Sequence, residues 1–110
     1  MDNEIAHAET IAINTCASYL RKYAEECVIY TTVEPCMMCI TTIVMANIRN
    51  IVFSLEDKYL DMDHFIDSTP YIKKRLNNYL GGVMAEESTH LLKTYSPFMA
   101  EVVLNGKKPS

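Results

Sequence analysis

The sequence predicts a protein of the α/β class, and three stretches carry that prediction. Residues 27–33 are β-branched, aromatic and without charge, which is typical of a buried strand. Residues 36–47 are apolar on nearly every side, as in a buried helix, and residues 51–55 form a second apolar strand. A strand, a helix and a strand joined by short connections predict a right-handed crossover between parallel strands.

An amphipathic helix is expected before the first of these strands. Asp2 and Asn3 are good N-caps for a helix that begins at about Glu4. From Ala8 to Tyr23 the apolar side chains recur at helical spacing, so we expect them to face the core. This stripe consists of Ala8, Ile11, Ala12, Thr15, Cys16, Tyr19, Leu20 and Tyr23.

The second half of the chain is expected to add one short strand and further helices. Thr69 and Pro70 are typical of a helix start, with threonine as the cap and proline at the first helical position. The other elements that we expect are a helical turn at 62–66, a strand over 76–80, a tight turn at Gly81-Gly82, a helix over 84–94 and a last helix from Ser96 to Leu104.

Size and charge limit the kinds of function. The chain has 110 residues, 49% of them apolar, which fits one small domain over residues 1–110. Its net charge of −4 argues against tight binding to a long nucleic acid, because phosphate contacts need a basic surface. The run Lys73-Lys74-Arg75 is most simply a solvated face, with a phosphate contact as the less favoured alternative. His64 is expected at the surface.

The cysteines and the first residues bear on location. No apolar stretch is long enough to span a membrane, and no basic segment followed by an apolar one marks a signal peptide. Four cysteines, two of them spaced as metal ligands often are, favour a reducing compartment over a disulfide framework. We therefore expect a cytoplasmic protein.

Two short segments carry residues suited to chemistry, His7-Ala8-Glu9 and Pro35-Cys36-Met37-Met38-Cys39. Cys36 and Cys39 are three residues apart and so share one face of a helix, and Pro35 suits the start of that helix. Thiols at a helix N-terminus are favoured as thiolates by the unpaired N–H groups there. Taken alone, the cysteine pair fits a catalytic metal centre, half of a structural zinc site or a redox pair. Cys16 and Cys27 lack ligand spacing and are expected to be core residues.

In order and spacing, the two segments resemble the zinc-dependent cytidine and deoxycytidylate deaminase superfamily, whose signature is His-x-Glu followed by Pro-Cys-x-x-Cys. The stretch Thr32-x-Glu34-Pro35-Cys36-x-Met38-Cys39 is most similar to the tRNA adenosine deaminase and guanine deaminase branch. Residues 81–87, Gly-Gly-Val-Met-Ala-Glu-Glu, resemble the last strand and the following helix of that branch. The similarity covers essentially the whole chain.

The resemblance implies a three-layer α/β/α fold, with a mostly parallel sheet, helices on both faces and a zinc ion at the N-termini of two helices. The zinc ligands that it implies are His7, Cys36 and Cys39. Glu9 is then the residue that moves protons, and the backbone near Ala8 and Glu34 faces the base.

The function that the resemblance implies is hydrolytic deamination of a nucleobase, nucleoside or nucleotide, with Zn²⁺ as cofactor and with a homodimer or larger assembly as the working form. Because the chain is acidic, a small substrate is expected rather than tRNA. One alternative is a weakly active or inactive zinc-binding module that acts in oligomerisation. A thiol redox protein that uses Cys36 and Cys39 is another.

The chain departs from the family pattern at its start. Family members carry a helix and two strands before the His-x-Glu motif, whereas His7 lies near the beginning of this sequence. The fold is therefore expected to be truncated at its N-terminus, with the strand at 28–33 on a sheet edge. Since exposed apolar edges invite pairing, we expect a partner copy or swapped structure to cover that edge; the alternative is that the chain is a truncated product or a fragment.

Overall fold

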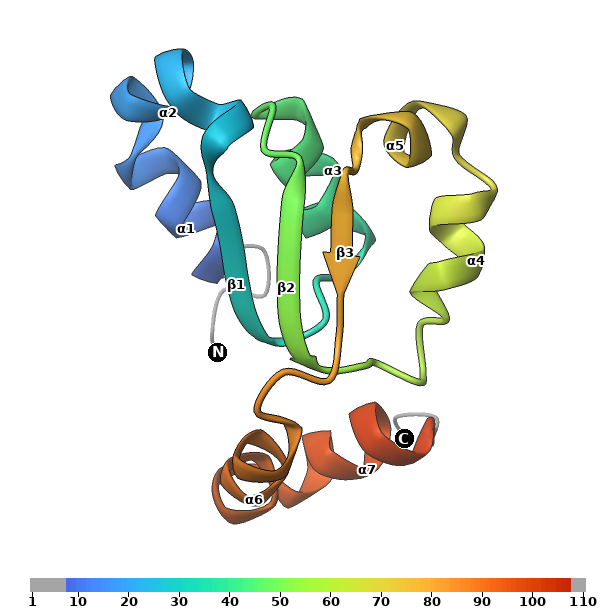
Figure 1. The fold of residues 1–110 in the computed structure, drawn as a ribbon. Coiled ribbons are helices and arrows are strands. Elements are labelled where there is room, and N and C mark those ends of the chain that lie inside the picture. Colours follow the sequence, from blue (N-terminus) through green and yellow to red (C-terminus); the bar gives the residue numbers. More distant parts are fainter. Residues whose placement is uncertain (1–7, 108–110) are drawn as a thin grey trace.

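Three parallel strands form the sheet of a computed structural model that describes residues 8–107 (Figure 1). They are β1 (Val28–Val33), β2 (Asn50–Leu55) and β3 (Asn78–Leu80), in the spatial order β1-β2-β3. The predicted α/β class and the parallel crossover from β1 to β2 are confirmed, and β1 lies at an edge of this sheet. The expected helix start at Glu4 and its caps lie outside the described residues.

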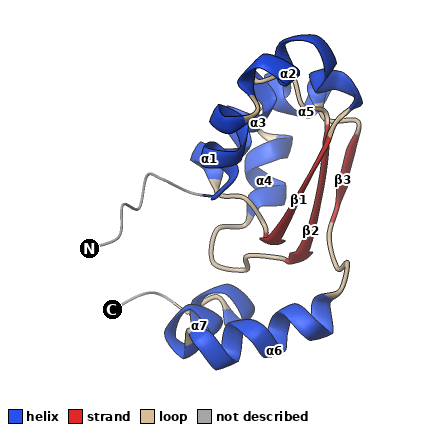
Figure 2. Ribbon diagram, turned by 90° about the vertical axis from the view of Figure 1, so that its left-hand side faces the viewer, coloured by secondary structure: helices blue, strands red, loops and turns tan. Residues whose placement is uncertain are grey.

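The described helices cover one face and one end of the sheet. Figure 2 shows α1, α3, α4 and α5 on one side of the strands, and α6 and α7 beyond the carboxyl ends of the strands. Their bounds are α1 (Ala8–Thr15), α2 (Ala17–Tyr23), the 3-10 helix η1 (Ala24–Glu26), α3 (Met37–Met45), α4 (Met62–Asp67), α5 (Pro70–Arg75), α6 (Ala85–Tyr95) and α7 (Pro97–Asn105). In this part of the chain no helix is long and apolar enough to cross a membrane.

The core lies between the sheet and α3. Ile40 and Ile43 of α3 and Ile51 of β2 are fully buried there, and burial of each such side chain contributes about 1.5–3 kcal/mol. Residues alternate along a strand, so Val28, Tyr30 and Leu80 point to the opposite face. They are 59%, 49% and 54% exposed, which leaves that face of the sheet partly open.

The first helical segment differs from the sequence prediction. It is interrupted at Cys16, whose φ of −100° and ψ of 15° are not helical, so α1 and α2 are separate helices. A helical stripe stays on one face only while the helix is continuous, so the expectation that the stripe faces the core is wrong for most of its described members, while Leu20 does pack against the core. Cys16, Ile11 and Tyr19 are exposed, whereas Ile13 is buried.

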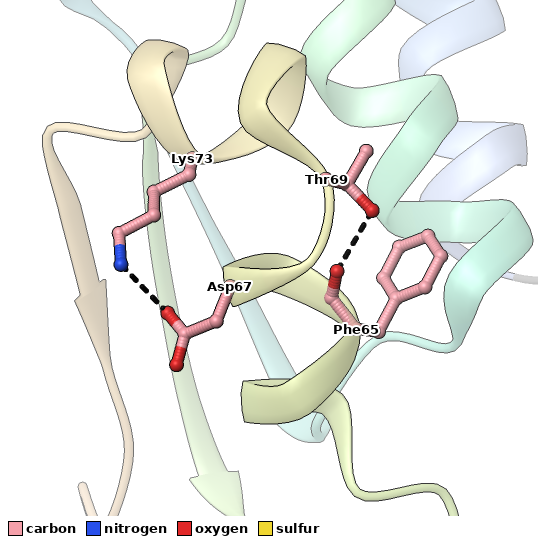
Figure 3. Close-up of polar contacts among 4 residues, drawn as sticks. All are labelled: Phe65, Asp67, Thr69 and Lys73. Atoms are coloured by element: carbon pink, nitrogen blue, oxygen red, sulfur yellow. Dashed lines mark hydrogen bonds and ion pairs between the residues drawn. The ribbon is translucent and has the colours of Figure 1, made fainter.

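The basic run on α5 is confirmed as a solvated face. Lys73 pairs with Asp67 at 2.9 Å, and both side chains are largely exposed (Figure 3).

Thr69 does sit at the cap of α5, but its hydroxyl donates to the carbonyl of Phe65 at 2.8 Å and caps no N–H group of α5 (Figure 3). This helix lies at the end of the sheet opposite to α6 and α7 (Figure 1). His64 is exposed, as expected.

Candidate active site

The turn between β1 and α3 presents both cysteines of the Pro-Cys-x-x-Cys motif. Cys36 is the N-cap of α3, with an extended backbone, and its carbonyl accepts the N–H of Ile40 at 2.8 Å. Cys39 lies in the first turn of the helix and is fully buried. Pro35 precedes the cap and is not the first helical residue, a shift of about one position from the expectation. Both thiols thus lie at the positive end of α3.

A cavity of about 630 Å³ lies beside this turn and is lined by residues of β1, α1, α6 and α7. Glu9, in the first turn of α1, and Cys36 both line it, so the structure brings one residue of each sequence motif to the same cavity. Part of the lining comes from α6 and α7, which the sequence did not connect with the site. The remaining lining residues are Ala12, Ile29, Tyr30, Thr31, Thr32, Val33, Glu34, Asp57, Leu92, Ser96, Met99 and Val103.

The donors at this turn fit a zinc ion. Thiolates are soft ligands that zinc prefers. His7, the third expected ligand, lies outside the described residues. Between residues 8 and 107, no three His, Cys, Asp or Glu residues gather as a complete metal site. The described part therefore supplies the two thiols and, in Glu9, a nearby carboxylate.

Glu34 contributes a buried carboxyl group next to Cys36. The side chain is 4% exposed; its Oε1 accepts the N–H of Asp57 at 3.1 Å, and its Oε2 accepts the hydroxyl of Tyr79. Burial raises the pKa of Glu34, and the two hydrogen bonds offset this only in part. Burial, together with the bond to Glu34, also raises the pKa of Tyr79, which keeps its proton in place as the donor.

The sequence pointed to Glu34 only for its backbone, and to Asp57 and Tyr79 not at all. Asp57 follows β2, lines the cavity, and has its pKa raised by burial. The signal in the sequence for a buried Glu34 side chain was its position between an apolar strand and a proline, where burial is expected. Ala8 begins α1, so its backbone stands next to Glu9 at the helix start.

Comparison with known families identifies the chain. Residues 1–55 match the family described as the cytidine and deoxycytidylate deaminase zinc-binding region. The chain belongs to this family, and the expected superfamily is thereby confirmed. Because the matched region is a zinc-binding region, the family match also confirms zinc as the cofactor.

Curated relatives carry deaminase names. The tRNA-specific adenosine deaminase of Haemophilus influenzae is 33% identical over 95 residues, which cover 82% of this chain and 54% of that protein. The enzyme of the same name from Aquifex aeolicus is 44% identical over 54 residues, 48% of this chain and 36% of that protein. A probable cytosine deaminase of Schizosaccharomyces pombe is 39% identical over 54 residues, 49% of this chain and 33% of that protein.

The chain thus spans between about a third and just over half of the length of these relatives. No solved structure matched it.

Proposed function

We propose that this chain is a zinc-dependent hydrolytic deaminase that acts on an amine-bearing nucleobase, free or in a nucleoside or nucleotide. The observation that carries the proposal is the shared cavity of Glu9 and Cys36. Its volume of about 630 Å³ lies within the usual range of small-molecule sites. A purely structural zinc site has no use for a carboxylate beside it, and membership of a deaminase family supports the reaction class.

The proposed roles follow from the chemistry of the side chains. His7, Cys36 and Cys39 would hold the zinc ion, which when bound would supply a water of lowered pKa. Glu9 accepts a proton from the attacking water and passes protons to the ring nitrogen and to the leaving amine. The carbon that bore the amine becomes a carbonyl, and ammonia leaves. The backbone near Ala8 and Glu34 orients the base.

The lining of the cavity favours an uncharged base or nucleoside over a phosphate. It carries three carboxyl groups, those of Glu9, Glu34 and Asp57, and its described members include no Lys or Arg. A phosphate placed among these groups would be repelled. The names of the relatives from Haemophilus influenzae and Aquifex aeolicus support adenine as the base. If the base belongs to an RNA, its phosphates then lie outside the cavity.

The proposal is tested by ammonia release from the purified, zinc-loaded chain. The panel is cytosine, cytidine, deoxycytidylate, guanine, adenine and tRNA, with Glu9→Ala as the control. Release from a member of the panel, lost in the control, supports the proposal and names the substrate class. Silence across the panel with zinc firmly bound contradicts it and favours a zinc-binding module that acts in oligomerisation.

We further propose that two copies of the chain pair through β1. This strand is at the sheet edge, contains no charged residue or proline, and exposes Val28 and Tyr30 on one face. Such an edge lacks the features by which proteins block edge-to-edge pairing. Two β1 edges related by a two-fold axis are self-complementary, which is the commonest symmetry of homodimers.

Replacing Thr32, an exposed residue of β1, by lysine is expected to convert the dimer into a monomer. Lysines at a two-fold edge lie close to each other and repel, and charge on an edge strand opposes pairing. Sedimentation velocity at micromolar protein measures the change. Thr41→Lys, at an exposed position of α3, is the matched control and should remain dimeric. A wild-type chain that sediments as a monomer would refute the pairing.

A further inference from the structure

Two hydrogen bonds hold the turn that carries Cys36 against the carboxyl end of β2. The N–H of Glu34 donates to the carbonyl of Leu55 at 2.8 Å. The N–H of Asp57 donates to the carboxyl Oε1 of Glu34 at 3.1 Å. Since only Pro35 separates Glu34 from Cys36, and Pro35 is itself buried, the position of Cys36 depends on the position of Glu34.

A third hydrogen bond to this turn comes from a residue of β3. The hydroxyl of Tyr79 donates to the Oε2 of Glu34, and the Tyr79 ring packs on Phe53 with ring centroids 5.0 Å apart. Phe53 in turn fills the space beside Gly81, where an added Cβ would lie 2.4 Å from the Phe53 ring. The packing of Phe53 therefore sets where the Tyr79 hydroxyl stands, and the hydroxyl holds the carboxyl of Glu34.

The contacts make this carboxyl group difficult to replace. Glu34 is almost wholly buried, so water does not substitute readily for a lost donor. Removing the Tyr79 hydroxyl leaves one buried oxygen without its hydrogen bond, which favours a shift of the turn that satisfies it. Because Pro35 links Glu34 to Cys36, any such shift also displaces the N-terminus of α3, where both thiols lie.

We propose that Tyr79 and Glu34 are positioning residues for the zinc ligands, and that the Tyr79–Glu34 hydrogen bond holds Cys36 in the geometry that zinc needs. This inference rests on the proposed ligand set of His7, Cys36 and Cys39. It assigns to a buried glutamate and a half-buried tyrosine a role that neither sequence motif contains.

The test is the zinc affinity of Tyr79→Phe, measured by competition with a chromogenic chelator. The substitution keeps the ring and its packing on Phe53 but removes the hydroxyl. We expect the zinc affinity to fall by about 10–100-fold, the usual effect of losing a residue that orients a metal ligand. Equal affinity in Tyr79→Phe and the wild type would overturn the inference.

Thr69→Val is the matched control for a merely structural effect. It also removes a hydroxyl that makes a hydrogen bond, to the Phe65 carbonyl at 2.8 Å, but at the N-cap of α5, which lies at the end of the sheet opposite to α6 and α7 (Figure 1). We expect this variant to keep wild-type zinc affinity, whatever its loss of stability in urea. If both variants lose zinc affinity equally, the effect is general destabilisation and the inference is wrong.

Glu34→Gln tests the same hydrogen bond from its other end. In glutamine one of the two carboxyl oxygens is replaced by an NH2 group, so either Tyr79 or Asp57 loses its acceptor and faces a donor, and zinc affinity should again fall. Because both variants break one network, the double variant should lose less than the product of the two single losses. Independent, multiplicative losses would contradict the inference.

The proposed ligand set has its own test. A wild-type chain that binds no stoichiometric zinc refutes the ligand set and, with it, the positioning role. A wild-type chain that binds zinc tightly while Tyr79→Phe does so equally well refutes the positioning role alone.

Discussion

Glu9→Gln is expected to lower the turnover number for deamination by about 10²–10⁴-fold, the usual contribution of a general acid–base residue. Glutamine has nearly the same shape as glutamate but can neither accept a proton from water nor return it to the substrate. The change is measured as ammonia release under saturating substrate, with the zinc content of each preparation determined by atomic absorption. Zinc should remain at the wild-type level, because Glu9 is not a proposed ligand.

The matched control is Glu26→Gln, the same substitution at an exposed glutamate in η1, which should keep full turnover. Wild-type turnover in Glu9→Gln would remove the proton-transfer role from this residue. Loss of zinc from Glu9→Gln would show instead that Glu9 is a ligand.

The local part of the site was predictable from the sequence because its signals are local. A run without charge formed β1, and an almost wholly apolar segment formed α3. The proline before Cys36 predicted a helix start, and the cap of α3 lies within about one residue of that position. A strand, a tight turn and a helix are each decided by neighbouring residues, so the placement of both thiols at a helix N-terminus followed.

The long-range part was not predictable in the same way. Tyr79 is 45 residues from Glu34 in the sequence, and nothing in either local pattern links them. Leu92 of α6 and Met99 of α7 line the cavity together with Glu9, although no pattern in the sequence connects them with the site. Their placement depends on where α6 and α7 dock, which is decided by tertiary packing rather than by propensity.

Cys16 shows the limit of periodicity in a different way. Its position in the apolar stripe predicted burial, but the break between α1 and α2 falls on this residue. An unbroken repeat in the sequence does not reveal such a break, because several residues there are compatible with both geometries. The consequence is useful, since an exposed cysteine outside the site becomes a control for the cysteines within it.

Cys36→Ser is expected to abolish stoichiometric zinc binding and, with it, turnover. A serine hydroxyl is a harder and far less acidic donor than a thiol, and it offers zinc no thiolate. The loss of affinity should exceed the roughly 10–100-fold that changes to residues behind the ligands produce. The measurements are zinc per chain after dialysis against a weak chelator, and ammonia release from the substrate that the panel identifies.

Cys16→Ser is the matched control, because it makes the same chemical change at an exposed cysteine, and it should keep zinc and activity. Retained stoichiometric zinc in Cys36→Ser would place the ligands elsewhere. A Cys36→Ser chain that has lost zinc but turns over substrate at the wild-type rate would separate the metal from the reaction.

A redox pair, by contrast, predicts a reversible disulfide between Cys36 and Cys39 in the wild type. Since zinc coordination and a disulfide compete for the same two sulfur atoms, full zinc occupancy with both thiols reduced would exclude that pair as the working state of the site.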